Sequence, residues 1–295
     1  MALRIGVDLG GTNLRVALVR ENGTIVRESE QLTEAEKGPD SVITKMMDMV
    51  RGIKGEDIIK GVGVGSPGPL DPFTGTIHQP PNLPGWDSIP LARILEESLG
   101  EHVEIDNDAN AAALAEAKFG AGAGAQSVYY ITVSTGVGGG FVIGGEIFQG
   151  ATGYAAEIGN MIILPSGPTH NSLNAGALES LASGTAIGLA GQKAGIAGGA
   201  EEVFRLAMVH DPIAQSIIDE ALNYLAIGIA NLAHAVNPSI FVMGGGVMKS
   251  ESQVLDPLRG KVKTYVYPGL KHTIKIVPAS LGSKAGVVGA AFLIK

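Results

Sequence analysis

The segment LRIGVDLGGTNLRVALV, residues 3–19, determines the fold that we expect for this chain. From Leu3 to Leu9 the residues alternate and then run apolar, which predicts a β-strand. The alternation resumes from Asn13 to Val19, and Gly10-Gly11-Thr12 separates the two stretches as a turn. The segment therefore predicts a hairpin with an acid, Asp8, close to its glycine turn.

The rest of the chain alternates between predicted strands and helices in two halves, joined at the flexible segment 120–125. In the first half we expect strands over Thr24–Glu30, Ile59–Gly65 and Val103–Asp106, and helices over Asp40–Ile53, Pro90–Leu99 and Ala109–Phe119. In the second half we expect strands over Ser127–Ser134, Gly139–Gly144, Glu146–Phe148, Ser239–Met243 and Thr273–Val277, and helices over Pro212–Val236 and Lys284–Leu293. This order predicts an α/β protein.

The composition excludes several classes of protein. Of 295 residues, 43 are glycine and none is cysteine, so the chain has no disulfide, thiolate metal ligand or thiol nucleophile. The net charge of −8, without a basic run, argues against partners such as nucleic acids or anionic membranes. Residues 121–145 and 221–248 lack charges, but polar residues interrupt them, so we interpret both as buried core rather than membrane spans. The N-terminus lacks the apolar core of a signal peptide, and we expect a cytoplasmic protein.

Three glycine runs are candidate nucleotide-binding loops, each with an ordinary turn as the alternative. In residues 8–12 the glycines let backbone N–H groups approach a phosphate, the Thr12 hydroxyl can donate to it, and Asp8 can hold Mg²⁺ directly or through water. Residues 134–140 repeat this context in the second half, and two such loops suit a nucleoside triphosphate. Residues 244–246 end an apolar strand, where adenine or ribose could lie against bare backbone.

Residues 63–68 match the dinucleotide-binding spacing G-x-G-x-x-G, but we reject that interpretation. A Rossmann loop must open directly into a helix, whereas Pro67 and Pro69 lead into a long loop. The sequence has no Walker-type phosphate loop either.

The segment Asp106-Asn107-Asp108-Ala109-Asn110 is the strongest local signal for chemistry. It ends a predicted strand and begins a predicted helix, so Asp108 is a natural helix N-cap. The alternative is that Asp108 is a general base that takes a proton from a substrate hydroxyl. Asn107 would then hydrogen-bond neighbouring hydroxyls. Taken alone, the segment favours the cap, and the six histidines have no spacing for a helical metal site.

Taken together and in order, these motifs resemble the ROK family of sugar kinases, within the superfamily of sugar kinases, actin and Hsp70. The resemblance runs over essentially the whole chain. The matching segments are Asp8–Thr12 (first phosphate loop), Gly65–Pro69 (G-x-P-G-P), Asn82–Trp86 (N-L-P-G-W), Asn107–Asn110 (N-D-A-N), Ser134–Gly140 (second phosphate loop), Gly153–Gly159 (E-x-G-H segment) and Leu178–Gly184 (C-L-E-x-x-A-S-G).

The resemblance implies ATP-dependent phosphorylation of a hexose at its primary hydroxyl, with glucose first and Asp108 as general base. It implies sugar contacts from Gly68, Asn82, Asn107, Asp108, Glu157, Asn160 and Glu179. It implies that ATP and Mg²⁺ contact Asp8, Gly10, Gly11, Thr12, Thr135, Gly136, Gly138, Gly244, Gly245 and Gly246, with Mg²⁺ at Asp8. Kinases for N-acetylmannosamine, N-acetylglucosamine, mannose, fructose or a glucoside stay as alternatives.

The implied fold is two actin-like, ribonuclease-H-like domains with a central cleft, and the implied assembly is a homodimer. We expect residues 1–120 with 284–295 to form a sugar- and phosphate-binding domain, and residues 121–283 to form a nucleotide- and sugar-binding domain. Repressors that resemble this family carry a DNA-binding domain before the kinase-like part, which we do not expect here because Asp8 lies almost at the N-terminus. A non-catalytic sugar-binding regulator is a third class.

One departure from the family pattern concerns zinc. The family motif C-x-C-G-x-x-G-C would fall at residues 170–177, where His170, Ser172 and Ala177 replace its three cysteines. The family's E-x-G-H histidine, its fourth zinc ligand, is Asn160 here. A tetrahedral site cannot survive the loss of all four ligands, so we predict no structural zinc. Asn160 can still bond a sugar hydroxyl, but with a different reach from imidazole.

Overall fold

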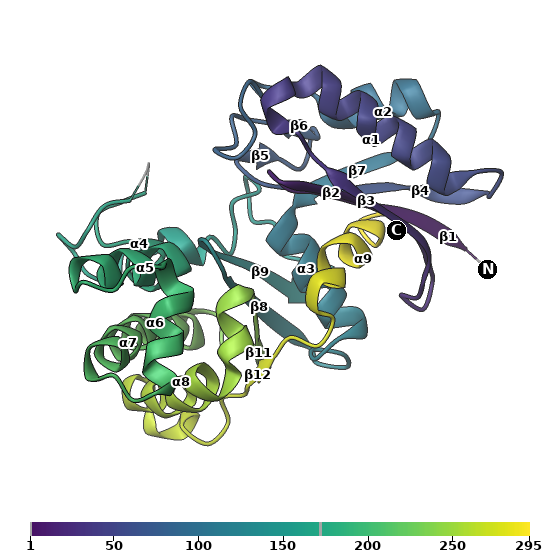
Figure 1. The fold of residues 1–295 in the computed structure, drawn as a ribbon. Helices are drawn as coiled ribbons and strands as arrows, with labels where there is room; N and C mark the ends of the chain where they lie inside the picture. Colours follow the sequence, from purple (N-terminus) through teal and green to yellow (C-terminus); the bar gives the residue numbers. More distant parts are fainter. Residues whose placement is uncertain (1, 171–172) are drawn as a thin grey trace. The chain divides into compact units, whose positions relative to one another are not determined.

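The computed structural model describes residues 2–170 and 173–295. The chain forms two compact units that alternate along the sequence (Figure 1). The first unit contains the residues up to Gly124, residues 140–155 and residues 281–295, and the second contains residues 125–139 and 156–280. The predicted domains differ from these units chiefly over residues 140–155, which belong to the first unit. The sugar and nucleotide roles of the two domains stay a prediction.

The first unit is built on a five-stranded sheet in the order β3-β2-β1-β4-β7. Its strands are β1 (Leu3–Leu9), β2 (Asn13–Arg20), β3 (Ile25–Leu32), β4 (Ile59–Ser66) and β7 (Val103–Asn107). The first three are antiparallel neighbours, β4 runs parallel to β1, and β7 parallel to β4. The predicted hairpin is confirmed: the amide of Gly10 donates to the carbonyl of Asn13 at 2.9 Å and closes the turn. A separate pair of short strands is β5 (Leu70–Asp71) and β6 (Thr76–Ile77).

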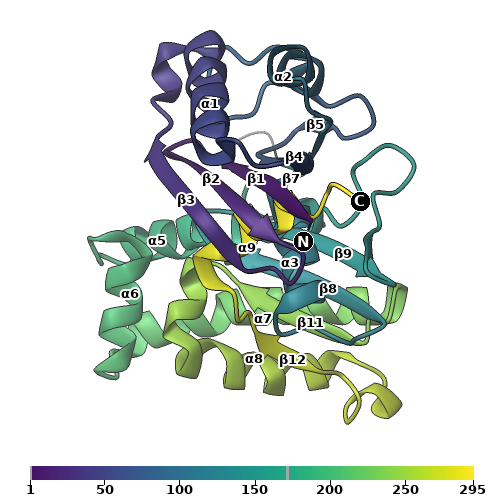
Figure 2. The same ribbon diagram turned by 90° about the vertical axis from the view of Figure 1, so that its right-hand side faces the viewer.

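Helices cover both faces of this sheet (Figures 1 and 2). α1 (Pro39–Lys54) and α2 (Leu91–Leu99) lie on one face, and α3 (Asp108–Phe119) and α9 (Ala285–Ala291) lie on the other. The helical spacing of apolar residues in α1 places Val42, Met46 and Val50 in the core. Two short 3₁₀ turns, η1 (Ala35–Lys37) and η5 (Gly282–Lys284), precede α1 and α9.

Small residues let α9 pack directly on α3 and on the sheet. A Cβ atom on Gly289 of α9 would overlap the carbonyl oxygen of Ala111 in α3. A Cβ on Gly6 of β1 would overlap the carbonyl oxygen of Val287. A Cβ on Gly63 of β4 would overlap the carbonyl oxygen of Ala290. Backbone contacts this close need glycine. The end of the chain therefore fixes the helix whose first turn carries the predicted base.

The strands of the second half form a five-stranded sheet in the order β10-β9-β8-β11-β12. They are β8 (Ser127–Val133), β9 (Val137–Ile143), β10 (Glu146–Ile147), β11 (Ile240–Gly244) and β12 (Ile276–Pro278). β8, β11 and β12 are parallel, whereas β10 pairs antiparallel with β9. The helices are α4 (Leu178–Ala182), α5 (Gly184–Lys193), α6 (Gly199–Met208), α7 (Pro212–Ala235) and α8 (Glu251–Tyr265), with 3₁₀ turns η2 (Ile158–Asn160), η3 (Gly246–Ser250) and η4 (Pro268–Leu270).

The sequence of the long helix α7 explains why this segment forms one continuous helix. The Asp211 carboxylate accepts a hydrogen bond from the amide of Ala214 at 2.9 Å, and Pro212 occupies the first helical position, where it loses no intrahelical bond. Apolar residues such as Leu222 and Ile229 are buried along its length. The uncharged stretch that raised the question of a membrane span is thus largely core of the second unit, and no helix of the described residues is both long and apolar enough to cross a membrane.

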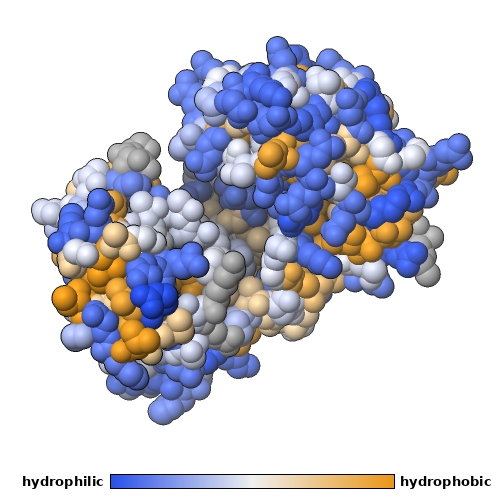
Figure 3. All heavy atoms as spheres, viewed as in Figure 1, coloured by the Kyte–Doolittle hydropathy of each residue, from blue (hydrophilic) through white to orange (hydrophobic). Residues whose placement is uncertain are grey.

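The predicted α/β class is confirmed, and the predicted strands and helices are found at or near their expected bounds. β12 is shorter than predicted and begins at Ile276, because the amides of Thr273 and Ile274 donate to the carbonyl of Leu270 in a turn. Figure 3 shows apolar residues gathered over the part of the second unit where α6 and α7 lie. Exposed apolar residues there include Met208 and Ile213.

Candidate active site

The loop that joins β1 and β2 lines a pocket of about 420 Å³ in the first unit. Its lining residues are Asp8, Gly10, Gly11, Thr12, Asn13, Arg15 and Ser283. The structure thus brings the four predicted phosphate-loop residues of this unit to one open pocket, together with an arginine. Backbone amides, a hydroxyl and a guanidinium are groups that bind phosphate oxygens.

The carboxyl group of Asp8 sits half-buried in this pocket, and its pKa is raised. Burial is the main cause, and the charge of Glu30 adds to it, while the Arg15 guanidinium acts in the opposite direction. Arg15 is itself held by an ion pair with Glu30 at 2.7 Å and donates to the carbonyl of Ser283. A Cβ on Gly286 would lie 2.7 Å from Asp8 Oδ2, so only glycine leaves room for the carboxylate beside α9.

The junction of β7 and α3 presents Asp108 at the first residue of the helix. The N-cap is Asn107, whose Oδ1 accepts from the amide of Ala109 at 2.9 Å. The expectation that Asp108 is a natural cap is therefore wrong by one residue, because the extended backbone of Asn107 already places an amide oxygen on that donor. Asp108 is exposed, and its Oδ1 also accepts from Ala109, at 2.7 Å.

Asp106, which the sequence analysis did not single out as a site residue, is the buried support of this junction. It is only 2 % exposed and accepts hydrogen bonds from the amide of Asn107 at 2.7 Å, Asn110 Nδ2 at 2.8 Å and Gln149 Nε2 at 2.8 Å. Burial raises its pKa, and these hydrogen bonds oppose the rise. An acid two residues before the base, at the end of a buried strand, was the signal that could have found it.

The two predicted sugar-side loops of the first unit lie against these elements. A Cβ on Gly68 would lie 3.4 Å from Asn107 Nδ2, so this loop borders the N-cap of α3. A Cβ on Gly11 would lie 2.9 Å from the carbonyl oxygen of Asn82, so the N-L-P-G-W segment backs the phosphate loop. The first unit therefore holds all its predicted site residues in neighbouring loops.

In the second unit the loop 134–140 is braced by a carboxylate from elsewhere in the chain. Glu179 of α4 accepts a hydrogen bond from the amide of Val137 at 2.8 Å, and its Oε2 occupies the space that a Cβ on Gly136 would need. The start of α5 adds two bonds: Gly184 N donates to the carbonyl of Ser134 at 2.7 Å, and Thr185 Oγ1 donates to that of Thr135 at 2.8 Å. The loop is thereby fixed to α4 and α5.

Glu157 and Glu179 form an acidic pair beside this loop. Glu157 is accessible to solvent, but enough protein surrounds its carboxyl group that desolvation raises the pKa, and the charge of Glu179 raises it further. Gly159 lies directly against the carbonyl of Val137, where a Cβ would overlap it. The turn with Glu157 and the helix with Glu179 therefore meet at one loop.

The third glycine run ends β11 and lies beside the same loop. Gly245 has φ +93° and approaches the carbonyl of Val133 so closely that a Cβ would overlap it. Gly246 lies near the Ser134 hydroxyl, at 3.7 Å from a Cβ placed on the glycine. Gly244 packs against the hydroxyl of Tyr130, so its lack of a side chain also serves the core.

The segment that replaces the zinc motif is held by amides. Asn160 Oδ1 accepts hydrogen bonds from the backbone amide and from Nδ2 of Asn174, both at 3.1 Å. Ser172, one of the three replaced cysteine positions, lies outside the described residues. Within residues 2–170 and 173–295, no group of three or more His, Asp or Glu side chains is arranged to hold a metal ion. The absence of zinc stays a prediction.

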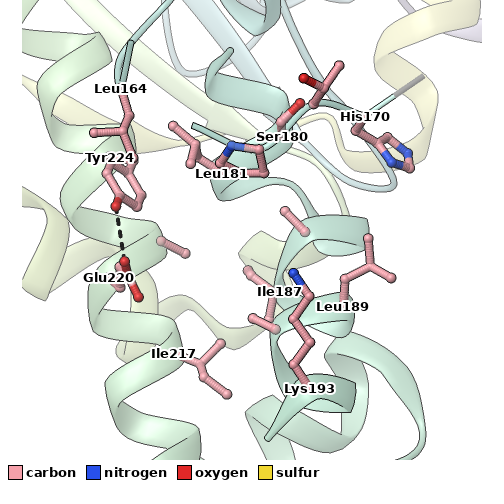
Figure 4. Close-up of a pocket in the computed structure, with 15 residues that line it drawn as sticks. Leu164, His170, Ser180, Leu181, Ile187, Leu189, Lys193, Ile217, Glu220 and Tyr224 are labelled. Atoms are coloured by element: carbon pink, nitrogen blue, oxygen red, sulfur yellow. Dashed lines mark hydrogen bonds between the residues drawn. The ribbon is translucent and has the colours of Figure 1, made fainter. Parts of the chain in front are cut away.

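A pocket of about 380 Å³ in the second unit contains none of the predicted site residues (Figure 4). It is lined by α4, α5, α7 and the segment 164–170, and Figure 4 shows the Tyr224 hydroxyl bonded to Glu220 on one wall, at 3.0 Å. Ser180, which follows Glu179 in α4, lines it too. The pocket thus borders the helix that braces loop 134–140.

Comparison with known proteins decides the family. Residues 4–295 match the model of the ROK family. The chain belongs to the ROK family. This ROK protein is 36 % identical to a glucokinase from Thermotoga maritima over 310 residues, which cover 99 % of the chain and 96 % of the relative.

Solved structures of ROK proteins share the fold over the whole chain. A ROK hexokinase from Thermus thermophilus matches with a TM-score of 0.88 at 34 % identity, covering 99 % of this chain and 97 % of that one. A ROK glucokinase from Streptomyces griseus, solved with glucose and AMPPNP, matches with a TM-score of 0.83 at 32 % identity, covering 99 % of both chains. The resemblance inferred from the motifs and the actin-like fold class are confirmed.

Proposed function

We propose that this ROK protein transfers the γ-phosphoryl group of ATP to the primary hydroxyl of a hexose, with glucose as the first candidate. Glucokinase relatives at 36 % and 37 % identity, and the Streptomyces griseus glucokinase that binds glucose and an ATP analogue, support an ATP-dependent sugar kinase. The observation that carries the proposal in this chain is the exposed Asp108 at the start of α3, directly after its cap Asn107 and the buried Asp106 that fixes the junction.

Asp108 is the proposed general base. A carboxylate at the start of a helix can accept the proton of a sugar hydroxyl as that oxygen attacks phosphorus. Asn107 Nδ2 and the neighbouring loop at Gly68 provide donors and bare backbone next to it. Phosphoryl transfer needs mainly positioning and neutralisation of charge, so one base and a well-placed acceptor are sufficient side-chain chemistry.

The phosphates of ATP would bind the pocket at Gly10, Gly11 and Thr12, and loop 134–140 would supply further backbone donors. The residues present fit Mg²⁺, because this ion is usually held by one or two carboxylates together with substrate phosphates and waters, and Asp8 provides one carboxylate in the phosphate pocket. When bound, Mg²⁺ would neutralise phosphate charge. Asp8 would hold the ion directly or through water.

The sugar would be recognised by acceptors in the second unit as well. Glu157, Glu179 and Asn160 offer oxygens to hydroxyls, each of which donates one hydrogen bond. Asn160 already receives two bonds from Asn174, so its Nδ2 group is the part available to donate to a sugar oxygen. This geometry differs from that of an imidazole, which is why the kinases for N-acetylmannosamine, N-acetylglucosamine, mannose, fructose or a glucoside stay as alternatives.

We also propose that the protein is a homodimer and that it acts in the cytoplasm. Light scattering of the purified protein tests the dimer.

A coupled ADP-release assay across a panel of hexoses and their N-acetyl derivatives tests the function. We expect turnover that requires sugar, ATP and Mg²⁺, with glucose giving the highest kcat/KM. If purified protein binds a sugar by calorimetry but releases no ADP with any sugar, it is a non-catalytic regulator. If another sugar gives the highest kcat/KM, the proposed substrate changes, but the proposed kinase activity stands.

A further inference from the structure

One buried side chain bonds the first and the last of the four connections between the units. The chain first leaves the first unit after Gly124, re-enters it over residues 140–155, and returns to it for the last time at Leu281. Glu116, near the end of α3, is fully buried. Its Oε2 accepts from the amide of Ala121 and its Oε1 accepts from the amide of Leu281, each at 2.8 Å. One carboxylate therefore bonds the first and the last connection at once.

The surrounding backbone is shaped for this arrangement. The main-chain carbonyl of Glu116 accepts from the amides of Gly120 at 3.1 Å and Gly122 at 3.0 Å, so the same residue also ends the helix. Position 120 favours glycine, because the Cβ of any other residue would overlap Glu116 Oε2. Hydrogen bonds from backbone amides to a buried carboxylate are charge-assisted and short. The segment that looks like a free joint in the sequence is thus tied at its first residues.

The tie reaches the proposed chemistry along both connections. Glu116 belongs to the helix that begins with Asp108. Beyond Leu281 the chain passes through Ser283, which lines the pocket of Asp8 and accepts from Arg15, and then enters α9, which packs on α3. A shift of either connection would therefore move the walls of the phosphate pocket or the start of the base's helix.

We propose that Glu116 is a positioning residue, which ties the first and the last connection between the units to α3 and so restrains the start of that helix and the wall of the phosphate pocket at Ser283. This inference rests on the proposed function only for its kinetic consequence. The tie itself is a statement about two backbone amides and can be measured in a protein without substrate.

The test replaces the carboxylate by its amide, Glu116→Gln. The new NH₂ group faces one of two backbone donors, so one bond is lost and that amide remains without an acceptor. Hydrogen exchange should become at least about tenfold faster in residues 120–124 and 279–283, while the rest of α3 and α9 stays protected. The kcat for sugar phosphorylation should fall about tenfold or more, with the KM values for ATP and sugar changed less than about threefold.

Two control variants separate this role from general loss of stability. Glu97→Gln makes the same chemical change on the exposed surface of α2 and should alter neither exchange nor kcat. Met46→Ala opens a cavity in the buried face of α1 and should lower the melting temperature without accelerating exchange at the two connections. If exchange at residues 120–124 and 279–283 is unchanged in Glu116→Gln, or if Met46→Ala reproduces its effects, the proposal is overturned. Faster exchange without a fall in kcat also overturns it.

A distance measurement decides the tie independently of activity. Because the chain has no cysteine, Glu56→Cys and Ser216→Cys allow one spin label in each unit. Glu116→Gln should broaden the distribution of the distance between the labels, and an unchanged distribution overturns the proposal. A wild-type protein that phosphorylates no sugar refutes the proposed function alone, and the label and exchange measurements then still test whether Glu116 holds the connections.

Discussion

The loop at residues 8–12 and the loop at residues 134–140 look alike in sequence but are built differently. In the first, the acid, the glycines and the hydroxyl that line the pocket are consecutive, so the loop carries its own carboxylate, Asp8. In the second, the carboxylate is imported from α4: Glu179 bonds Val137 and fills the space beside Gly136. One loop is a local motif, and the other is part of a tertiary arrangement.

The difference suggests a division of labour. In the first unit Asp8 and Asp108 lie close to the ends of β1 and β7 and are half-exposed and exposed, which suits the ion binding and proton transfer that we propose for them. In the second unit Glu157 lies near enough to Glu179 for the charge of Glu179 to raise its pKa, and two neighbouring carboxylates suit acceptors for several hydroxyls. We therefore expect substitutions in the first unit to act on kcat and those around loop 134–140 to act on sugar binding as well.

The largest effect is expected from Asp108→Asn. Asparagine keeps the size and the exposed position but cannot take a proton, so kcat should fall by about 10² to 10⁴ while the sugar Kd stays within about threefold. Initial-rate kinetics and calorimetry check this. Near-normal turnover would refute the assignment of Asp108 as base. It would also refute the expectation that the acids of the first unit act on kcat.

Gly136→Ala is expected to act through Glu179. The new Cβ would displace the carboxylate from the amide of Val137, and a displacement of this size in a binding site can cost about 10² in kcat/KM. In a double-mutant cycle with Glu179→Ala the two effects should be strongly non-additive, because both remove the same contact. Gly11→Ala, which contacts Asn82 instead, should combine additively with Glu179→Ala. Additivity in both cycles would show that the two loops are not built differently after all.

A smaller effect is expected on stability and its pH dependence. The raised pKa of Glu157 means that its ionisation opposes folding, and this cost appears as the pH rises above the ordinary value of 4.5. Glu157→Gln should therefore raise the melting temperature near pH 7, lose that gain as the pH falls below 4.5, and weaken sugar binding. Calorimetric melting at both pH values checks this. A gain that grows toward acid pH would contradict the raised pKa.

The smallest effect is expected from metal removal. Because Asn160, which accepts two hydrogen bonds from Asn174, stands where the family pattern has a zinc ligand, dialysis against a chelator should leave the melting temperature unchanged. Elemental analysis should find zinc far below one atom per chain. Stoichiometric zinc would show that the second unit keeps a metal-organised loop.

These contrasts explain which parts of the site could be predicted from the sequence. The loop 8–12 and the junction before α3 are contiguous, so turn chemistry and strand periodicity were sufficient to find them. The predicted N-cap, Asp108, was wrong by one residue. Asn and Asp both favour this position, and only the extended backbone of Asn107 shows which of the two is the cap. Asp106 was missed, since its partner Gln149 is distant in sequence. The roles of Glu157 and Glu179 came from family resemblance alone, because no local pattern connects a short helix to a loop some forty residues earlier.

The tight packing of α9 on α3 has a consequence for how this gene would tolerate change. In a scan of all single substitutions, a selection for protein abundance should be most severe at Gly6, Gly63 and Gly289, where any side chain meets a carbonyl oxygen of the facing backbone. Asp108 should pass that selection, because it is exposed at the start of its helix. Only a selection for growth on the sugar would reveal it. The difference between the two maps would separate the residues that build the enzyme from those that make it work.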